Sequence, residues 1–299
     1  MVKRLISANA SDLLAMSPQE LKQSIKASEG RVVVSENVVI SPSWIPDITN
    51  SEMARAFGAD LILLNAFDVS RPAIQGLEDT SNAIIQTLKR LVGRPIGVNL
   101  EPVDQLAEMA SDRLAINVGR QATKASYQRA NVLGFDFICL TGNPGTGVTN
   151  DQLLEALSVA KETFQGLIIA GKMHGAGVNE PVMTPSVARA LIQRGADILL
   201  VPAVGTVPGF DSEQLRGIVT EAHQHGALVM SAIGSSQESA RPELIQQMAI
   251  QNKIAGVDLQ HIGDAGYSGL APAENIMALS EAIRGKRHTY SMMARSILR

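Results

Sequence analysis

Eight short apolar segments alternate along the chain with segments that carry helix-start and helix-stop signals, and this alternation constrains the fold most. The expected strands lie at residues 31–34, 61–64, 95–99, 137–140, 167–170, 198–201 and 228–230, with an eighth between 258 and 263; residues 38–40 are an alternative first strand. Consecutive parallel strands need a crossover, usually a helix, so the alternation predicts a parallel sheet. A closed (βα)8 TIM barrel accounts for eight such units better than an open doubly wound sheet does.

Capping residues mark the starts of several expected helices. Pairs with the spacing of a capping box are Ser17 with Glu20, Thr49 with Glu52, and Thr149 with Gln152. The first pair predicts an extra helix before the first strand. We therefore expect one TIM-barrel domain over residues 1–299, with an N-terminal helical extension at 1–30 and a C-terminal helical tail at 286–299.

A Gly-x-Asp sequence precedes every second expected strand. It occurs at residues 58–60, 134–136, 195–197 and 256–258. Each glycine suits the left-handed conformation that often ends a helix. The repeat reflects either half-barrel ancestry or the reuse of one favourable helix-to-strand turn.

Composition limits the classes of function. With 299 residues, of which 45% are hydrophobic and 18% charged, the chain can bury a large core. A net charge of −3 and the lack of a Lys/Arg run argue against a nucleic-acid partner. No apolar run has membrane-spanning length and the N-terminus lacks a signal-peptide pattern, so we expect a cytoplasmic protein with no membrane partner. Cys139, the only cysteine, cannot form an internal disulfide.

In a TIM barrel the active site lies where the strands end and the following loops begin. Lys172 and His174 follow the fifth expected strand, and both side chains can move protons near neutral pH once their pKa values are tuned. Lys172 is also a candidate for a Schiff base with a carbonyl substrate; the alternative is that both residues are structural. Glu101, after the third strand, is the third catalytic candidate, as a general base.

Other polar side chains at strand ends are candidates for binding substrate. Those after the second, third and fourth strands are Asn65, Asp68, Asn99, Thr141, Asn143 and Thr146. Oxygen ligands here can also hold Mg²⁺ with several waters, and Asp68 and Glu101 are the candidate metal ligands. The alternative for these carboxylates is surface charge and capping.

The loops after the seventh and eighth strands are rich in Gly and Ser, and this fold commonly binds phosphate there. Backbone N–H groups and hydroxyls can bind a phosphate without an arginine. The residues of this expected cradle are Ser235, Ser236, Gly263, Asp264 and Gly266. The competing anion site is the glycine-rich loop 142–147, which precedes a helix N-terminus.

Several segments resemble known families in order and spacing. They are GADLILLNAFD (58–68), RPIGVNLEP (94–102), DFICLTGNPGTGVTND (136–151) and LIIAGKMHGAG (167–177). Together they resemble the BtpA-like group of phosphosugar-type TIM barrels, whereas the N-terminal LKQSIKASEGRVVVSENVV is similar to a phosphonomutase-like bacterial family. The resemblance implies the fold and the place of the site, and it implies no catalytic residue.

Two functions follow from these observations. The first is an enzyme that acts on a small phosphorylated or carboxylated metabolite by lyase, isomerase or mutase-type chemistry, with an anionic small molecule as its partner. The alternative is a non-catalytic anion-binding or assembly factor of the BtpA-like type. The tail also carries an apolar stripe, Met292, Met293, Ile297 and Leu298, which predicts a homo-oligomer.

Overall fold

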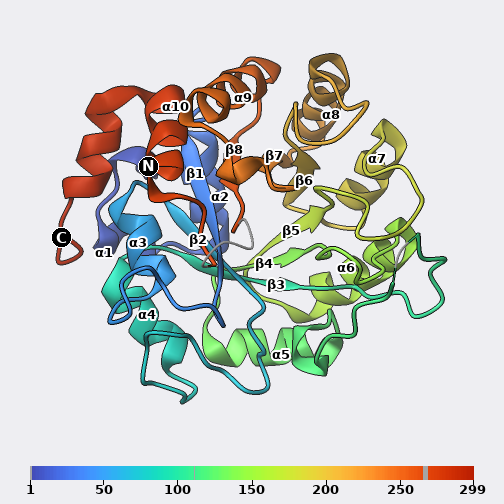
Figure 1. Ribbon diagram of the computed structural model, residues 1–299, viewed down its shortest axis with the longest axis horizontal. Helices are drawn as coiled ribbons and strands as arrows, with labels where there is room; N and C mark the ends of the chain where they lie inside the picture. The colour runs from blue at the N-terminus through green and yellow to red at the C-terminus, as the bar shows by residue number, and fades with distance from the viewer. Residues whose placement is uncertain (1, 111, 265–268) are drawn as a thin grey trace.

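The structure is a computed structural model that describes residues 2–110, 112–264 and 269–299. Eight parallel strands close a barrel in chain order, and helices surround it (Figure 1). The strands are β1 (Val32–Val38), β2 (Leu61–Asn65), β3 (Ile96–Leu100), β4 (Phe137–Leu140), β5 (Leu167–Gly171), β6 (Ile198–Pro202), β7 (Leu228–Ile233) and β8 (Leu259–Ile262). β8 pairs with β1, so that His261 lies beside Val34. The expected (βα)8 TIM barrel is confirmed.

Helices begin where the capping residues predict. The helices that follow the strands are α3 (Asn50–Ala56), α4 (Ile84–Val92), α5 (Lys124–Leu133), α6 (Asn150–Thr163), α7 (Pro185–Gln193), α8 (Ser212–Gln224), α9 (Pro242–Ala255) and α10 (Ala273–Ala294). Thr49 and Thr149 accept the expected hydrogen bonds from the N–H groups of Glu52 and Gln152. Short 3₁₀ turns, η2 (Val118–Arg120) and η3 (Gln237–Ser239), lie in the loops after β3 and β7.

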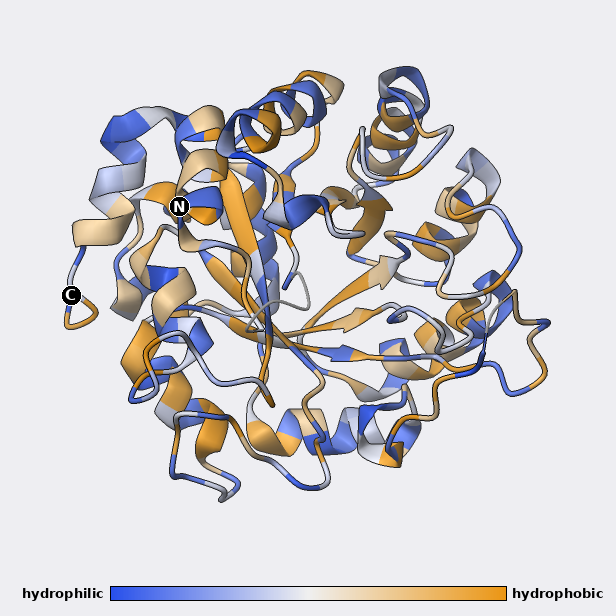
Figure 2. Cartoon of the chain, in the orientation of Figure 1, coloured by the Kyte–Doolittle hydropathy of each residue, from blue (hydrophilic) through white to orange (hydrophobic). Residues whose placement is uncertain are grey.

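The barrel has two apolar cores because its strands are buried on both faces. Figure 2 shows the hydrophobic colouring of many strand residues. One core lies between the strands and the surrounding helices. The other fills the barrel interior and continues into the N-terminal segment, which contains η1 (Leu5–Ser7), α1 (Ala10–Leu14) and α2 (Pro18–Lys26). Leu21 and Ile25 of α2 pack in the same cluster as Val32, Leu61 and Leu167, at the starts of three strands. The N-terminal extension therefore covers the end of the barrel opposite the strand carboxyl ends.

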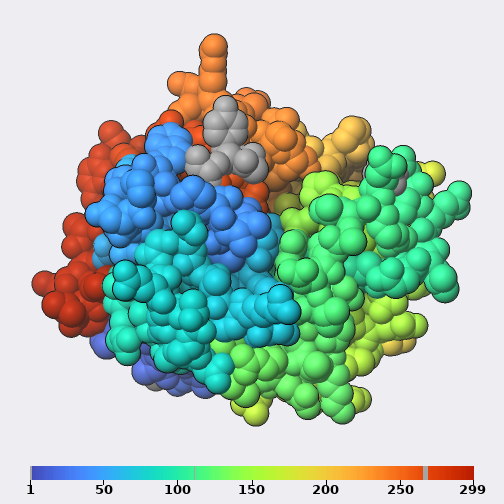
Figure 3. Space-filling view, turned by 60° about the horizontal axis from the view of Figure 1, so that its bottom comes forward, coloured from blue at the N-terminus to red at the C-terminus, as the bar shows by residue number. Residues whose placement is uncertain are grey.

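The C-terminal tail packs on its own chain. Gly285, with φ 71°, breaks α10 into two helical parts, and Met292 in the second part is buried. Arg295 donates to the carbonyl oxygens of Ser7 and Ala8, and the N–H of Ser11 donates to the Arg299 carbonyl. The tail therefore lies beside the N-terminal segment (Figure 3).

The four Gly-x-Asp sequences form the same structure four times. All four glycines have a left-handed φ, between 82° and 109°, as expected. Each aspartate side chain accepts a hydrogen bond from the first or second N–H of the preceding strand: Asp60 from Val33 (2.8 Å), Asp136 from Ile96 (2.8 Å), Asp197 from Ile168 (3.1 Å) and Asp258 from Val229 (2.9 Å). Each also contacts a basic side chain: Arg284, Lys89, Lys22 and His223 respectively. We call these four units the aspartate clamps, and they join neighbouring strands at the end of the barrel away from the mouth.

Within the described ranges, no helix is both long enough and apolar enough to cross a membrane.

Candidate active site at the barrel mouth

A cavity of about 310 Å³ lies at the carboxyl ends of the strands. This volume is at the small end of the range for ligand sites, roughly 300–1,000 Å³, and suits a small metabolite. The lining residues come from strand ends and the loops that follow them: Glu36, Asn65, Asn99, Thr141, Gly142, Asn143, Pro144, Met173, His174, Gly234, Ser235, Ser236, Glu238, Gly263 and Asp264. Nine of the expected site residues are among them.

Glu36 enters the cavity because of the alternation of β1. Val32 and Val34 belong to the interior core, so Glu36, two residues later, also points inward. Its carboxyl group lies 2.9 Å from Nε2 of His261, which comes from the neighbouring strand β8. Both residues are buried. Burial raises the pKa of Glu36, the contact with His261 opposes this rise, and Asp264 and Glu101 add to it. Glu36 therefore binds a proton more readily than an exposed carboxylate does.

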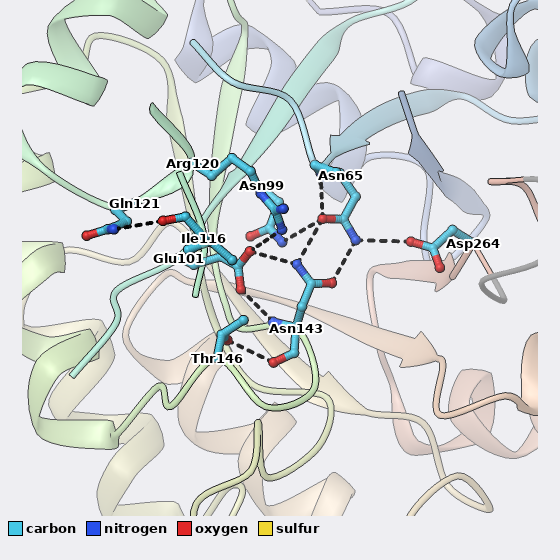
Figure 4. Close-up of polar contacts among 10 residues, drawn as sticks. Asn65, Asn99, Glu101, Ile116, Arg120, Gln121, Asn143, Thr146 and Asp264 are labelled. Atoms are coloured by element: carbon cyan, nitrogen blue, oxygen red, sulfur yellow. Dashed lines mark hydrogen bonds and ion pairs between the residues drawn. The ribbon is translucent and has the colours of Figure 1, made fainter. Parts of the chain in front are cut away.

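Amide side chains form the wall of the cavity that comes from β2, β3 and β4 (Figure 4). Asn65 donates to Oδ1 of Asn143 (2.9 Å) and to Oδ2 of Asp264 (3.0 Å). Asn143 and Asn99 in turn donate to Oδ1 of Asn65, at 3.0 and 3.3 Å. These mutual hydrogen bonds fix the orientation of the amide wall before any ligand binds.

Glu101 supports this wall from behind. Its carboxylate accepts hydrogen bonds from Arg120 Nη2 and from the N–H and Nδ2 of Asn143, all at 2.8 Å. Glu101 is buried but does not line the cavity, and Arg120 balances its charge. This geometry makes Glu101 a residue that positions Asn143.

The candidate metal ligands are both engaged by the protein's own hydrogen-bond donors. Asp68 accepts hydrogen bonds from the N–H groups of Ser70 (2.9 Å) and Arg71 (3.2 Å), and it does not line the cavity. Glu101 is occupied by Arg120 and Asn143. Among the residues that the structure describes, no group of three or more His, Cys, Asp or Glu side chains is arranged to hold a metal ion. Mg²⁺ binding by Asp68 and Glu101 stays a prediction, and both carboxylates would first have to give up these hydrogen bonds.

His174 faces Glu36 from the other side of the barrel, since β5 is opposite β1 in the strand order. The N–H of Ala176 donates to Nδ1 of His174 at 3.0 Å. A ring nitrogen that accepts a hydrogen bond carries no proton, so the proton of the neutral ring is on Nε2. Burial lowers the pKa of His174, and the charge of Lys172 lowers it further. His174 thus lines the cavity as a neutral imidazole whose Nε2–H can donate a hydrogen bond.

Lys172 lies elsewhere. Side chains alternate between the two faces of β5 and the residues after it. Ile169 and Met173 belong to the interior core, so Lys172 points to the other face, toward the surrounding helices. It is buried and forms an ion pair with Glu180, and its Nζ lies 3.5 Å from the carbonyl oxygen of Val148. Lys172 does not line the cavity, so this geometry does not favour a Schiff base. It instead anchors the loop that carries His174.

The alternative anion site in loop 142–147 is already filled by the protein's own groups. The first N–H of α6, that of Asn150, donates to Glu180 at 2.7 Å. Within the loop, the N–H of Asn143 donates to Glu101, and both the N–H and the hydroxyl of Thr146 donate to the Asn143 carbonyl. Thr146 is buried and shapes the loop without lining the cavity.

The expected phosphate cradle lies in an acidic part of the cavity. Ser235, Ser236, Gly263 and Asp264 all line it, whereas Gly266 lies outside the described residues. Glu238 joins them, and its carboxyl carbon would lie 3.8 Å from a Cβ at Gly263. Burial raises the pKa of Glu238, and Asp264 and Glu36 raise it further. The carboxyl groups of Glu238 and Asp264 thus lie beside the expected phosphate cradle, which stays a prediction.

Left-handed backbone conformations also gather at the mouth. Of the five non-glycine residues with positive φ in the described chain, four lie in the loops after β2, β5 and β7: Ala66, Ala176, Ser235 and Ser236. Such residues cost roughly 1–3 kcal/mol each and often occur at functional sites. Ala66 and Ala176 each bind the side chain of a cavity residue through their N–H groups, Asn65 and His174.

From the sequence, Glu36, Glu238 and His261 are also polar residues at strand ends, but no role was predicted for them. The signal for Glu36 was present, because it follows Val32 and Val34 at the spacing of one strand face. Glu238 lies in a loop whose turn brings it back over β8, and its sequence carries no comparable pattern.

The sequence matches a family model over almost its whole length. The model of the family DUF7916, a domain of unknown function, matches residues 6–299. No curated protein matches the sequence. The BtpA-like and phosphonomutase-like resemblances therefore stay predictions.

Two solved structures have a similar fold. A Schiff base forming fructose-1,6-bisphosphate aldolase is 15% identical, with 86% of this chain and 96% of that chain covered and a TM-score of 0.55. An archaeal fructose 1,6-bisphosphate aldolase is 16% identical, with 86% and 95% covered and a TM-score of 0.52. At these identities the likeness shows the fold alone.

Proposed function

We propose that this chain, which belongs to the DUF7916 family, is an enzyme of the lyase or isomerase type. Its substrate is a small phosphorylated or carboxylated metabolite with a carbonyl group. One observation carries the proposal: a neutral His174 and a basic Glu36 face the same small cavity from opposite strands.

His174 supplies the electrophile. Its Nε2–H donates a hydrogen bond to the carbonyl oxygen of the substrate, and this bond strengthens as negative charge develops on that oxygen. A neutral imidazole donates this hydrogen bond through Nε2–H, and the N–H of Ala176 holds it in the required tautomer.

Glu36 supplies the base. Its carboxylate takes a proton from the carbon beside the carbonyl, and the electron pair of that C–H bond moves into an enolate held by His174. Where the deprotonated carbon carries a hydroxyl group, Glu36 returns the proton to the former carbonyl carbon while the hydroxyl proton moves to the former carbonyl oxygen, which gives an isomer. In a lyase, Glu36 instead takes the proton of a hydroxyl group on the carbon beyond, that hydroxyl becomes a carbonyl, and the electron pair of the broken carbon–carbon bond forms the enolate held by His174. His261 positions the Glu36 carboxyl group at 2.9 Å. A carboxylate whose pKa is raised by burial accepts a proton more readily than one in water.

The proposal is tested by solvent exchange. The protein is incubated in D₂O with pyruvate, dihydroxyacetone phosphate and related keto acids and ketose phosphates, and proton NMR follows loss of the signal beside the carbonyl. We expect exchange with at least one compound, reduced about 100-fold or more in His174→Ala. His225→Gln is the control, since His225 is an exposed residue at the end of α8. Binding of a compound without exchange, in every case, would contradict the proposal and favour an anion-binding or assembly factor.

A further inference from the structure

We propose that the cavity binds a primary ammonium group of the substrate between Glu36, Glu238 and Asp264. This inference rests on the proposed function only in taking the bound molecule to be the substrate. It names the class of substrate: a small amino-bearing carbonyl compound or its phosphate or carboxylate derivative.

Charge is the first observation. The three carboxylates come from β1, the loop after β7 and the end of β8, which are consecutive in the closed barrel, so they form one acidic wall. No lysine or arginine is among the described lining residues, and the sequence places none at 265–268. The histidine of the cavity, His174, is neutral. A ligand that is only anionic would therefore meet three carboxyl groups on this wall and no lysine or arginine among the described lining residues.

An unsatisfied buried oxygen is the second, independent observation. Glu238 is 4% exposed, and its Oε2 has no hydrogen-bond partner within the described chain. A buried carboxylate oxygen left without a donor is costly, so such atoms usually indicate a missing partner. Asn99 Oδ1 and Thr141 Oγ1, which also line the cavity, have no partner in the described part of the chain. All three are oxygens, and all can accept a hydrogen bond from a ligand.

The electrostatic interactions among the three carboxylates favour the binding of a cation between them. Burial raises the pKa values of Glu36 and Glu238, and in both cases Asp264 raises the pKa further. His261 opposes the rise at both residues. The carboxylates therefore repel one another, and a bound ammonium group would offset part of that repulsion, while burial, the largest cause of the raised pKa of Glu36, would stay in place.

An ammonium group fits the donor and acceptor pattern better than a metal ion does. It carries three N–H donors, which suit oxygens spread over a wall. The carboxylates are not gathered tightly enough to form a metal-binding group within the described residues. An attached carbonyl oxygen would lie toward His174, on the opposite side of the cavity.

The test compares two ligands that differ only in the charged group. 1-Amino-2-propanol and 1,2-propanediol are titrated into the full chain at pH 7.5, and ligand-observed NMR gives each Kd. We expect the amine to bind at least 10-fold tighter than the diol. Glu238→Gln should weaken amine binding at least 10-fold and leave diol binding within twofold. Glu213→Gln, on the exposed face of α8, is the matched control and should change neither Kd.

A second variant keeps the three carboxyl groups and fills part of the cavity beside Glu238. A methyl group at Gly263 would contact its neighbours at ordinary distances, 3.4–3.8 Å, so Gly263→Ala is expected to fold. It should weaken amine binding because the methyl group lies next to the Glu238 carboxyl group. Equal binding of amine and diol by the wild type would overturn the inference. The inference would also be overturned if the wild type bound Mg²⁺ tightly, if Glu238→Gln abolished that binding, and if the wild type showed no preference for the amine over the diol. Amine binding without deuterium exchange would contradict the proposed function and leave the ammonium site standing.

Discussion

The aspartate clamps predict a graded loss of stability from one repeated substitution. In each clamp, Asp→Asn keeps a side-chain oxygen that can accept from the strand N–H and removes the charge that faces the basic partner. The partners differ in burial. Asp60 and Arg284 both have fully buried side chains, with Nη1 2.5 Å from Oδ2, whereas the side chains of Asp197 and Lys22 are 20% and 26% exposed at 3.4 Å.

The size of each effect follows from what the substitution leaves behind. Asp60→Asn leaves the guanidinium group of Arg284 buried without a counter-charge, which costs about 3–5 kcal/mol. Asp197→Asn breaks a partly exposed pair, which is worth about 0.2–1 kcal/mol. The free energy of unfolding from urea titration should therefore fall by at least about 2 kcal/mol more in the first variant than in the second.

The assay is urea unfolding followed by circular dichroism, with the slope m checked for each variant, since a changed slope would indicate a changed unfolded or native state. The double variant Asp60→Asn/Arg284→Met should recover part of the loss, because it removes the unpaired charge as well. Equal losses in Asp60→Asn and Asp197→Asn, or no recovery in the double variant, would refute this reasoning.

Three further predictions concern the barrel interior and the mouth. Glu36→Gln should raise the free energy of unfolding by about 0.5–2 kcal/mol at pH 7–8 while it abolishes exchange. Because the folded-state pKa of Glu36 is raised, the stability that this group contributes is full below its ordinary pKa of 4.5 and is lost as pH rises through the folded-state pKa. A gain in the variant that shrinks with rising pH would contradict this. Borohydride with pyruvate should give no mass adduct at Lys172, because its Nζ is buried against Glu180; an adduct mapped to Lys172 would show the opposite. Gly97→Ala should lower the free energy of unfolding by about 1–3 kcal/mol or more, since the new Cβ would lie 2.1 Å from the ring of Phe137. Gly217→Ala in α8 places a Cβ with nothing within 4 Å and should raise the free energy of unfolding by up to about 1 kcal/mol. Similar effects of the two changes would be inconsistent with the packing described.

The fold could be predicted because local signals agreed along the whole chain. Apolar runs, caps such as Thr149 and the Gly-x-Asp repeats each placed an element boundary, and eight alternating units left few alternatives. The same sequence did not show that the aspartates of these repeats bind the preceding strand. That contact joins residues about 27–40 positions apart, such as Asp60 with Val33, and no local pattern reports it.

The candidate site was only partly predictable, for a reason that lies in the strands themselves. In β5, residues on both faces are apolar, so alternation cannot tell from sequence whether Lys172 or its neighbours point inward. The structure directs Lys172 to Glu180 and away from the cavity. The amide wall was anticipated in Asn65, Asn99 and Asn143, because these polar residues follow apolar strands at the expected edge.

The measurement that tests the central claim most directly is the protonation state of His174 in solution. Long-range ¹⁵N–¹H correlation NMR of the protein, with His174→Gln used to assign the signals, reports the tautomer and the pKa together. The account predicts a neutral ring with the proton on Nε2 at pH 7, Nδ1 held as an acceptor from Ala176, and a pKa below the ordinary value of 6.5. A ring protonated on Nδ1, or a pKa at or above 6.5, would contradict the claim that a neutral His174 presents its Nε2–H to a substrate carbonyl.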